Sequence, residues 1–314
     1  MPGLAVIGHP VAHTRSPDMQ TAALAELGLA GEWTYGAIDI APEDFAAEVA
    51  ELAAAGDYAG VNVTLPHKEA ALAIADEATE AARAIGAANT LTFSDGRIAA
   101  ANTDAGGLLR SLPAVLVVAD APGRRAENSS HGGVSGPSTR VAQGSVDASA
   151  AARRALVLGA GGAARAVIWA LAHGGEGAPD ENGQPTLVPS FEVDVWNRTP
   201  DRAATVAAEL GGRAVTDPVA SDYPLIVNTT AVGLHGEDPF EHLPLGAEDF
   251  HPEQVVVDIV YGDEPSALLA AAAAAGATTV DGLEMLVQQG ALSLRIWTGE
   301  EPSLEAMRSG ARRA

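Results

Sequence analysis

The sequence predicts an α/β protein of two domains, and three observations support this prediction. The chain has 314 residues, enough for two domains at roughly 150 residues each. Apolar residues make up 47% of it, so each domain can bury a core. Segments typical of strands alternate with segments typical of helices, and the alternation begins again at residues 155–158, just before a glycine-rich turn at 159–162.

In the first half, apolar runs and turn residues locate the elements. Pro42 stands where helices tend to begin, Pro66 interrupts an apolar run, and Asp95-Gly96 is typical of a hairpin turn. We therefore expect strands at residues 4–7, 34–40 and 60–65, helices at 17–27, 43–54, 69–75 and 77–85, and a hairpin formed by 89–93 and 97–101.

The second half has the rhythm of a Rossmann-like parallel sheet. We expect strands at 155–158, 191–196, 225–228 and 255–259, and helices at 163–173, 202–210 and 265–275. Residues 119–152 and 174–190 interrupt this rhythm, because they are rich in Gly, Ser, Ala and Pro and lack periodicity. Long loops without structure are uncommon inside compact domains, so we expect both segments to be flexible insertions.

The charge and the missing residue types exclude several classes of function. A net charge of −23, from 41 acidic and 18 basic residues, repels nucleic acid and anionic membranes. The chain contains no cysteine, and its eight histidines form no H-E-x-x-H pattern, so no bound metal is expected. The first ten residues lack the pattern of a signal peptide, and no apolar run could span a bilayer, so we expect a cytoplasmic protein.

Lysine is nearly absent from the sequence. Lys68 is the only lysine among the 18 basic residues. Arginine keeps its proton at working pH, whereas lysine can release one. Lys68 is therefore a candidate for proton-transfer chemistry.

The turn after the strand at 155–158 fits a dinucleotide-binding motif. Gly159, Gly161 and Ala164 match G-x-G-x-x-A between a predicted strand and a predicted helix. The glycines permit a tight turn and the close approach of a pyrophosphate, which meets the positive N-terminus of the helix. A plain strand–helix connection is the alternative explanation, but the surrounding pattern favours a nucleotide site.

The next predicted strand indicates which dinucleotide binds. It ends in Asn197-Arg198-Thr199, and Arg202 follows, where NAD-binding proteins usually have an acid that holds the ribose. A guanidinium pairs with the 2′-phosphate of NADP, so NADP is favoured. Asp194 and Asp201 are nearby in the sequence, and a surface loop with two arginines is the alternative.

Four motifs in the first half are candidates for substrate binding. They are residues 8–17, residues 62–68, Ala88-Asn89-Thr90, and Asn102-Thr103-Asp104, and each alone could be a helix cap or a turn. As a set they resemble the shikimate dehydrogenase family, across nearly the whole chain apart from the two insertions. Further matches to this family are residues 159–163, 197–202, 228–233 and 257–261, and Asp281-Gly282-Leu283-Glu284-Met285-Leu286 with Gln289.

The resemblance implies a fold and an activity. The activity is the reversible, NADP-dependent reduction of 3-dehydroshikimate to shikimate, a step towards chorismate and the aromatic amino acids. The fold is a substrate domain of residues 1–104 and 283–314, an NADP-binding domain of residues 105–282, and a cleft between them. We expect a small-molecule substrate and a monomer or homodimer.

The resemblance also implies the role of individual residues. Lys68 and Asp104 would be catalytic, which agrees with the need for a cation and a proton donor when hydride addition leaves charge on a ketone oxygen. The substrate would be bound by Thr14, Ser16, Thr64, Asn89, Tyr261 and Gln289. The cofactor would be bound by Glu80, Gly159, Ala160, Gly161, Gly162, Ala163, Asn197, Arg198, Thr199, Arg202, Ile259 and Gly282.

Two positions depart from the family pattern. Thr14 stands where serine is usual, and its added methyl group leaves open quinate as a substrate or a broader specificity. Glu284 stands where glycine is common, and we expect its side chain to point to solvent. A non-catalytic nucleotide-binding sensor of the same fold is a further alternative, although a sensor has no need of Lys68 and Asp104 together.

Overall fold

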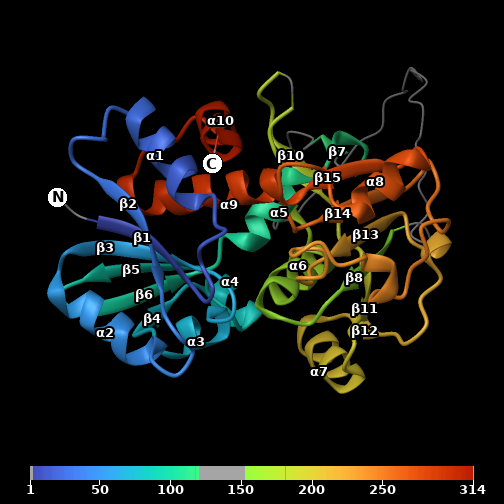
Figure 1. Cartoon of the computed structure of the whole chain (residues 1–314), viewed down its shortest axis with the longest axis horizontal. Helices are drawn as coiled ribbons and strands as arrows, with labels where there is room; N and C mark the ends of the chain where they lie inside the picture. The colour runs from blue at the N-terminus through green and yellow to red at the C-terminus, as the bar shows by residue number, and fades with distance from the viewer. Residues whose placement is uncertain (1–2, 117, 120–152, 181, 314) are drawn as a thin grey trace, which may run out of the picture.

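The computed structural model describes residues 3–116, 118–119, 153–180 and 182–313. Two six-stranded sheets lie side by side with helices around each of them (Figure 1), and a third sheet has three short strands. This mixed architecture confirms the predicted α/β fold with a Rossmann-like parallel sheet. No helix in these residues is long and apolar enough to cross a bilayer.

The first sheet has the strand order β2-β1-β3-β5-β6-β4. β1 runs parallel to both its neighbours, whereas β5 is antiparallel to β3 and β6. The strands are β1 (Gly3–Gly8), β2 (Thr34–Asp39), β3 (Tyr58–Val63), β4 (Glu77–Ala78), β5 (Thr90–Ser94) and β6 (Arg97–Ala101). The helices of this region are α1 (Ser16–Glu26), α2 (Phe45–Ala55), α3 (Lys68–Ala73) and α4 (Glu80–Ile85).

The apolar run of β1 is explained by burial on both faces of the sheet. All six of its residues are buried. Ile7 belongs to a core with Phe45 of α2 on one face, and Val6 belongs to a core with Met19 of α1 on the other. Successive side chains of a strand point to opposite faces, so a central strand covered by helices on both sides must be apolar throughout.

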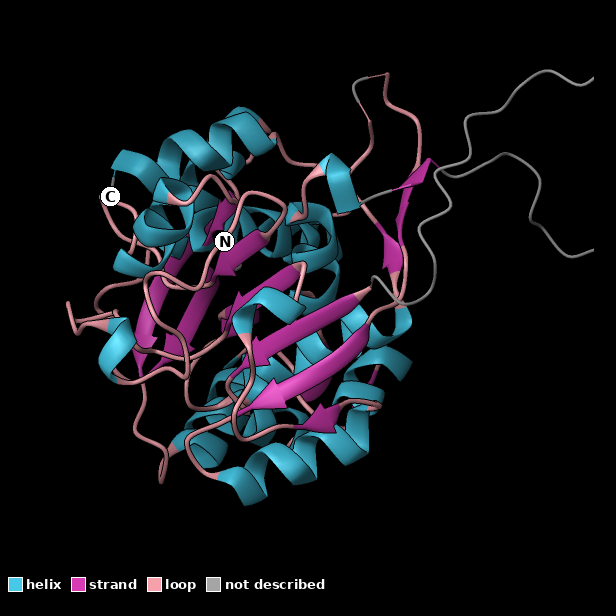
Figure 2. Cartoon of the chain, turned by 90° about the vertical axis from the view of Figure 1, so that its right-hand side faces the viewer, coloured by secondary structure: helices cyan, strands magenta, loops and turns pink. Residues whose placement is uncertain are grey.

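The second sheet is parallel throughout and has the order β12-β11-β8-β13-β14-β15. Figure 2 shows its strands running side by side with helices on both faces. The strands are β8 (Arg154–Leu158), β11 (Glu192–Trp196), β12 (Arg213–Ala214), β13 (Leu225–Asn228), β14 (Val255–Asp258) and β15 (Thr278–Asp281). The helices are α6 (Gly162–His173), α7 (Pro200–Leu210) and α8 (Ala267–Ala274).

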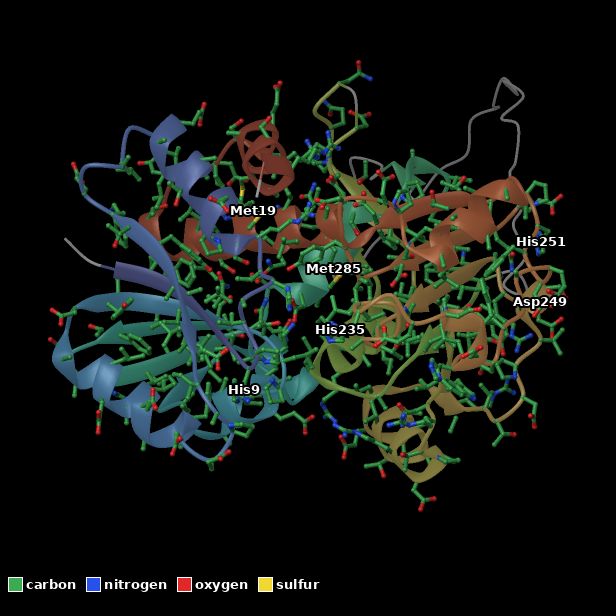
Figure 3. All side chains as sticks on the ribbon, viewed as in Figure 1. His9, Met19, His235, Asp249, His251 and Met285 are labelled. Carbon is green, nitrogen blue, oxygen red and sulfur yellow. The ribbon has the colours of Figure 1, made fainter. Side chains whose placement is uncertain are left out.

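The end of the chain returns to the first sheet. α5 (Asp104–Ser111) packs between the two halves, against both α6 and α9 (Gly282–Thr298). α9 and α10 (Leu304–Arg313) pack against α1, and Leu294 and Met307 share one core with Met19. Met19 lies beside these helices and Met285 lies near the centre of the molecule (Figure 3). The two ends of the chain therefore build one half of the molecule together.

Some elements differ from the sequence prediction. The single helix expected at 77–85 is the short strand β4 followed by α4, because the Thr79 side chain accepts a hydrogen bond from the Ala82 N–H and begins a new helix. β12, β15, α5, α9 and α10 were not predicted as separate elements, although the resemblance assigned residues 283–314 to the substrate domain. These strands contain only two and four residues, and β12 is exposed, so neither has a clear apolar run.

The two predicted insertions have different outcomes. Residues 120–152 lie outside the described residues. The segment 174–190 was expected to lack regular structure, but it contains β9 (Gly175–Glu176) and β10 (Thr186–Val188), which pair with β7 (Val118–Ala119) in the small sheet. Val188 and Thr186 are buried, which anchors this segment on the second half.

Candidate active site

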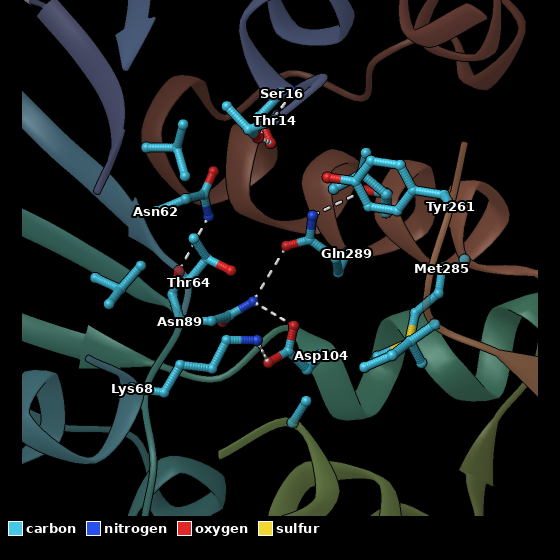
Figure 4. Close-up of a pocket in the computed structure, with 16 residues that line it drawn as sticks. Thr14, Ser16, Asn62, Thr64, Lys68, Asn89, Asp104, Tyr261, Met285 and Gln289 are labelled. Atoms are coloured by element: carbon cyan, nitrogen blue, oxygen red, sulfur yellow. Dashed lines mark hydrogen bonds and ion pairs between the residues drawn. The ribbon is translucent and has the colours of Figure 1, made fainter. Parts of the chain in front are cut away.

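A pocket of about 130 Å³ lies between the two halves of the molecule. Figure 4 shows Lys68 and Asp104 on one side of it and Thr14, Ser16 and Tyr261 on the opposite side. Polar side chains from both halves line the pocket, and the lining residues are Val6, Thr14, Ser16, Asn62, Val63, Thr64, Lys68, Asn89, Asp104, Ala163, Ile259, Tyr261, Gly282, Met285, Leu286 and Gln289. All eight residues predicted as catalytic or substrate-binding are in this set.

Lys68 and Asp104 form a buried ion pair in this pocket. The Lys68 Nζ atom lies 2.6 Å from Oδ2 of Asp104, and the two side chains are only 12% and 5% exposed. Each is the first residue of its helix, α3 or α5, so both project from a helix start. The positive N-terminus of α5 interacts favourably with the carboxylate of Asp104.

The strand–helix corner that carries Lys68 is fixed by its neighbour His67. The His67 ring is buried, stacks on Phe45 at 4.4 Å and hydrogen bonds to the carbonyl of Ile40 at 2.8 Å. Burial lowers the pKa of His67, so the neutral ring is favoured. The contacts of the His67 ring therefore hold the backbone at the start of α3, where Lys68 lies, in a fixed position.

Asn89 connects the ion pair to α9. Its Nδ2 atom donates to Oδ1 of Asp104 at 2.9 Å and to Oε1 of Gln289 at 3.1 Å. Its Oδ1 atom accepts a hydrogen bond from the Thr103 N–H at 2.7 Å, which fixes the amide orientation. A Cβ atom at Gly107 would lie 2.6 Å from Cβ of Gln289, so only a glycine in α5 lets α9 approach this closely.

A second layer of polar side chains supports Asn89 from the core. Asn62 receives a hydrogen bond from the Tyr35 hydroxyl at 2.8 Å and donates to Ser293 at 2.9 Å. Thr90 and Thr103 also contact Ser293, at 2.9 and 3.0 Å. Asn62, Thr90 and Thr103 lie in the motifs named above as substrate-binding candidates, although no role was assigned to them, whereas Tyr35 and Ser293 were not predicted. The signal for Asn62 was a polar residue within an apolar strand, but its partner Ser293 is 231 positions away.

Hydroxyl groups gather at the other end of the pocket. Thr14 Oγ1 donates to Ser16 Oγ at 3.1 Å, and Ser16 is buried. Burial raises the pKa of the Tyr261 hydroxyl, and its interactions with the Thr14 side chain and the Arg15 backbone oppose this rise. Three neutral hydroxyls facing one space are suited to hydrogen bonding an anionic group such as a carboxylate.

The glycine turn lies directly against the ion pair. Gly159 has φ of 115°, which favours glycine. A Cβ atom at Gly162 would lie 2.8 Å from Cβ of Lys68, so this glycine lets the start of α6 reach the catalytic candidate. A side chain at Gly282 would collide with the backbone of Ile259. The absence of a side chain at Gly282 therefore lets the segments that follow β14 and β15 lie close together. Ala163, Ile259 and Gly282 thereby reach the pocket.

A second hollow, of about 380 Å³, lies at the carboxyl ends of β11 and β13. It is lined by Trp196, Asn197, Arg198, Thr230, Ala231, Val232, Glu237, His242 and Leu243. Asp194 does not line it, because its buried carboxylate is paired with Arg154 and Arg213. Arg198 thus lines this hollow from the loop after β11, and Asp194, the nearby acid of that strand, is already paired with two arginines.

The remaining predicted cofactor residues are spread over several elements. Arg202 donates from Nε to the carbonyl of Ala160 at 2.9 Å, and its Nη2 atom lies 3.3 Å from Oε1 of Glu69. Thr199 is the N-cap residue of α7, beside Arg198. Glu80 is exposed at the start of α4 and lines neither hollow, so its cofactor role stays a prediction. Among the lining residues that follow β13, Thr230 and Val232 lie in the segment 228–233 that resembles the family, whereas the sequence did not point to Glu237 and His242.

Glu284 does not point freely to solvent, so that expectation is wrong. Its two carboxylate oxygens accept hydrogen bonds from Arg308 at 2.7 and 2.8 Å, and one also accepts from Gln288. The side chain is 28% exposed and lines neither hollow. A charged partner on α10 explains why this position departs from glycine without entering the cleft.

Fold and site together define a class of protein. A parallel sheet with a glycine turn, placed beside a polar pocket that contains a lysine–carboxylate pair, is the arrangement of a dinucleotide-dependent oxidoreductase. The described residues contain no group of three or more His, Cys, Asp or Glu side chains that could hold a metal ion.

Comparison with known proteins identifies the family. The family model for the shikimate dehydrogenase substrate binding domain matches residues 6–91, and the model for the shikimate 5'-dehydrogenase C-terminal domain matches residues 282–309. A curated relative, the shikimate dehydrogenase (NADP(+)) of Thermus thermophilus, is 42% identical over 99% of this chain and 97% of its own length. The chain belongs to the shikimate dehydrogenase family.

Solved structures agree with this assignment. The crystal structure of shikimate 5-dehydrogenase from Thermus thermophilus in complex with NADP(H) and shikimate matches with a TM-score of 0.74 and 40% identity, covering 100% of this chain and 99% of that one. A ligand-free 5-ketofructose reductase of Gluconobacter sp. strain CHM43 matches with a TM-score of 0.73 and 27% identity, covering 99% and 98%. The fold therefore occurs in reductases of more than one carbonyl compound.

Proposed function

We propose that this chain is an NADP-dependent shikimate dehydrogenase, which reduces 3-dehydroshikimate to shikimate reversibly. The observation that supports this most strongly is the 2.6 Å ion pair of Lys68 and Asp104, which lies inside the pocket. The glycine turn of the second sheet lies directly against that pair. A proton donor and a dinucleotide turn in contact are what the reduction of a ketone requires.

The residues at the turn fit a bound dinucleotide. In the described structure no side chain caps the first turn of α6, and a Cβ at Gly161 would meet open space. The backbone N–H groups at this helix start can therefore bind a pyrophosphate. We assign this contact to Gly159, Ala160, Gly161, Gly162 and Ala163, and the adenosine end to Asn197, Arg198, Thr199 and Arg202. Glu80, Ile259 and Gly282 are the remaining residues that we assign to cofactor binding. The cofactor supplies the hydride when it is bound.

Lys68 and Asp104 carry the proton chemistry in this proposal. The Lys68 ammonium group donates a proton to the carbonyl oxygen of the substrate as negative charge develops there. Asp104 keeps the amine in position and balances its charge inside a pocket where both are nearly buried. In the reverse direction Lys68 accepts the proton of the substrate hydroxyl.

The other polar residues bind and orient the substrate. Thr14, Ser16 and Tyr261 hold its carboxylate at one end of the pocket. Thr64, Asn89 and Gln289 bind the ring hydroxyls near Lys68. Because the Thr103 N–H fixes the Asn89 amide, which donates to Asp104 and Gln289, Asn89 also holds these two side chains in position.

The domain division and the setting of the enzyme are part of the same proposal. We assign residues 1–104 and 283–314 to a substrate domain and 105–282 to an NADP domain, because α9 and α10 pack on α1. We infer that the enzyme is a cytoplasmic monomer or homodimer. Its charge of −23 argues against nucleic acid or an anionic membrane as a partner.

A spectrophotometric screen tests this function. Purified protein is assayed with shikimate and with quinate, each with NADP and with NAD. Shikimate with NADP should give the highest kcat/KM of the four pairs. A clear preference for quinate would overturn the substrate assignment and favour an effect of the Thr14 methyl group. Binding of NADP without turnover of either compound would support the sensor instead.

A further inference from the structure

Arg15 stands between Thr14 and Ser16 in sequence, but its side chain reaches other parts of the molecule. Its Nη2 atom lies 2.6 Å from Oδ1 of Asp263, and Nη1 donates to the carbonyl of Ala311 at 3.2 Å. The Arg15 side chain is only 12% exposed. It thus joins the first loop of the chain to the loop after β14 and to the last helix.

The loop after β14, residues 259–266, carries Tyr261, and Arg15 contacts it at two points. The guanidinium carbon of Arg15 lies 6.0 Å from the centroid of the Tyr261 ring, while the ion pair holds Asp263 two residues further on. Tyr261 lines the hydroxyl end of the pocket together with Thr14 and Ser16. Arg15 therefore connects the loop that carries Tyr261 to the segment that carries Thr14 and Ser16.

Arg15 does not bind the substrate itself. It is not among the residues that line the pocket, and in the described structure Lys68 is the only basic residue that does. The Arg15 charge is also compensated by Asp263 at ion-pair distance. Its effect on the site must therefore come from the position that it gives to the loop.

We propose that Arg15 is a positioning residue, whose ion pair with Asp263 holds the loop 259–266 against residues 14–16 and sets the spacing of the three carboxylate-binding hydroxyls. This inference rests on the proposed function. The Asp263 side chain is 87% exposed, so the pair contributes little to global stability. The ion pair instead favours the position of the loop against residues 14–16. Loss of the ion pair should therefore appear as weaker substrate binding.

Steady-state kinetics of Arg15→Gln, Asp263→Asn and the double variant test the proposal. Each single change should raise the KM for shikimate about two- to fivefold, which is the change in affinity that the loss of a partly exposed ion pair produces. The kcat and the KM for NADP should stay at the parent values. The double variant should show no further rise, because either change alone removes the pair. Asp263→Glu keeps a carboxylate and should restore most of the parent KM.

Hydrogen–deuterium exchange of the ligand-free proteins gives a second readout. Amides of residues 259–266 should exchange faster in both single variants, whereas the loss of another exposed ion pair, in Arg97→Gln on β6, should change neither this exchange nor the KM. Asp263→Asn alters an exposed side chain, so it reports even where Arg15→Gln does not fold.

Two results would overturn the positioning role. One is an unchanged KM for shikimate in both single variants of an active parent. The other is a double variant whose rise in KM is the product of the two single effects, since this would mean that the residues act independently. A parent enzyme that does not oxidise shikimate would instead overturn the proposed function on which the inference rests.

Discussion

The Lys68 amine lies 2.6 Å from the Asp104 carboxylate although the two residues are 36 positions apart. They meet because α3 begins after the end of β3 and α5 begins after the end of β6, on the side of the first sheet that faces the glycine turn. This places a nearly buried ion pair in the pocket, directly against the glycine turn that we propose binds the cofactor. Four predictions concern the second hollow, α9, the second sheet and this pair.

The first concerns the choice of cofactor. Replacing Arg198 and Arg202 together by alanine should weaken NADP binding strongly, because a charge-assisted hydrogen bond contributes about 1.5–3 kcal/mol. NAD lacks the 2′-phosphate, so its affinity should change little and serves as the internal control. Isothermal titration calorimetry with each cofactor measures both dissociation constants. Equal losses for NADP and NAD would mean that these arginines do not bind the phosphate.

The second concerns Glu284 and the family departure at this position. Glu284→Gly should leave the KM for NADP unchanged, because the side chain faces Arg308 on α10 and lines neither hollow. It should lower the free energy of unfolding by about 1–2 kcal/mol through the lost ion pair and the added backbone freedom of glycine. Glu284→Ala, which removes the same carboxylate without adding a glycine, separates the two contributions. A marked change in the KM for NADP would contradict this placement.

The third prediction concerns Asp194, a buried acid on β11 of the second sheet. Burial alone would raise its pKa, but hydrogen bonds from Arg213, Tyr223 and Arg154 outweigh burial and hold the pKa below its ordinary value of 3.8. A lowered pKa in the folded state means that the carboxylate stabilises the fold at neutral pH. This contribution is lost as the pH falls below 3.8 and through the folded pKa.

Urea unfolding of Asp194→Asn as a function of pH measures this effect. At neutral pH the variant should be less stable by about 2–3 kcal/mol, since two arginines lose their charged partner. The difference from the parent should shrink as the pH falls below 3.8, because the parent carboxyl also loses its charge. A difference that stays constant into this acid range would show that the charge of Asp194 is not the cause.

The sequence predicted most of the fold because the information is local. β8, the glycine turn and α6 are contiguous, so an apolar run followed by Gly159 and Gly161 is sufficient to place them. The catalytic candidates were predicted because Lys68 is the only lysine and because residues 62–68 and 102–104 resemble motifs of the family. Their meeting at 2.6 Å depends on the packing of the whole first half.

The parts that the sequence did not predict depend on distant partners. Ser293 supports Asn62 and Thr90 from α9, and this contact forms only because the end of the chain returns to the first sheet. Glu284 has a charged partner on α10, which sequence spacing alone could not show. β10 forms because it pairs with β7 and β9, which lie outside the elements predicted from the sequence.

The fourth prediction concerns the proton donor and tests the central claim. Removing Lys68 takes away the only amine in the pocket lining of the described residues. Positioned proton transfer contributes about 10²–10⁴-fold to rate, so Lys68→Ala should lower kcat by about this factor. Lys68→Arg keeps the charge but cannot release a proton at working pH, so it should be severely impaired too.

The decisive measurement is the kcat of Lys68→Ala with shikimate and NADP at saturation, beside the NADP affinity and the circular dichroism of the same protein. We predict a kcat lowered by about 10²–10⁴-fold, with cofactor affinity and secondary structure unchanged. A kcat near that of the parent would contradict the catalytic role of Lys68, and Asp104 would then have to act without the lysine.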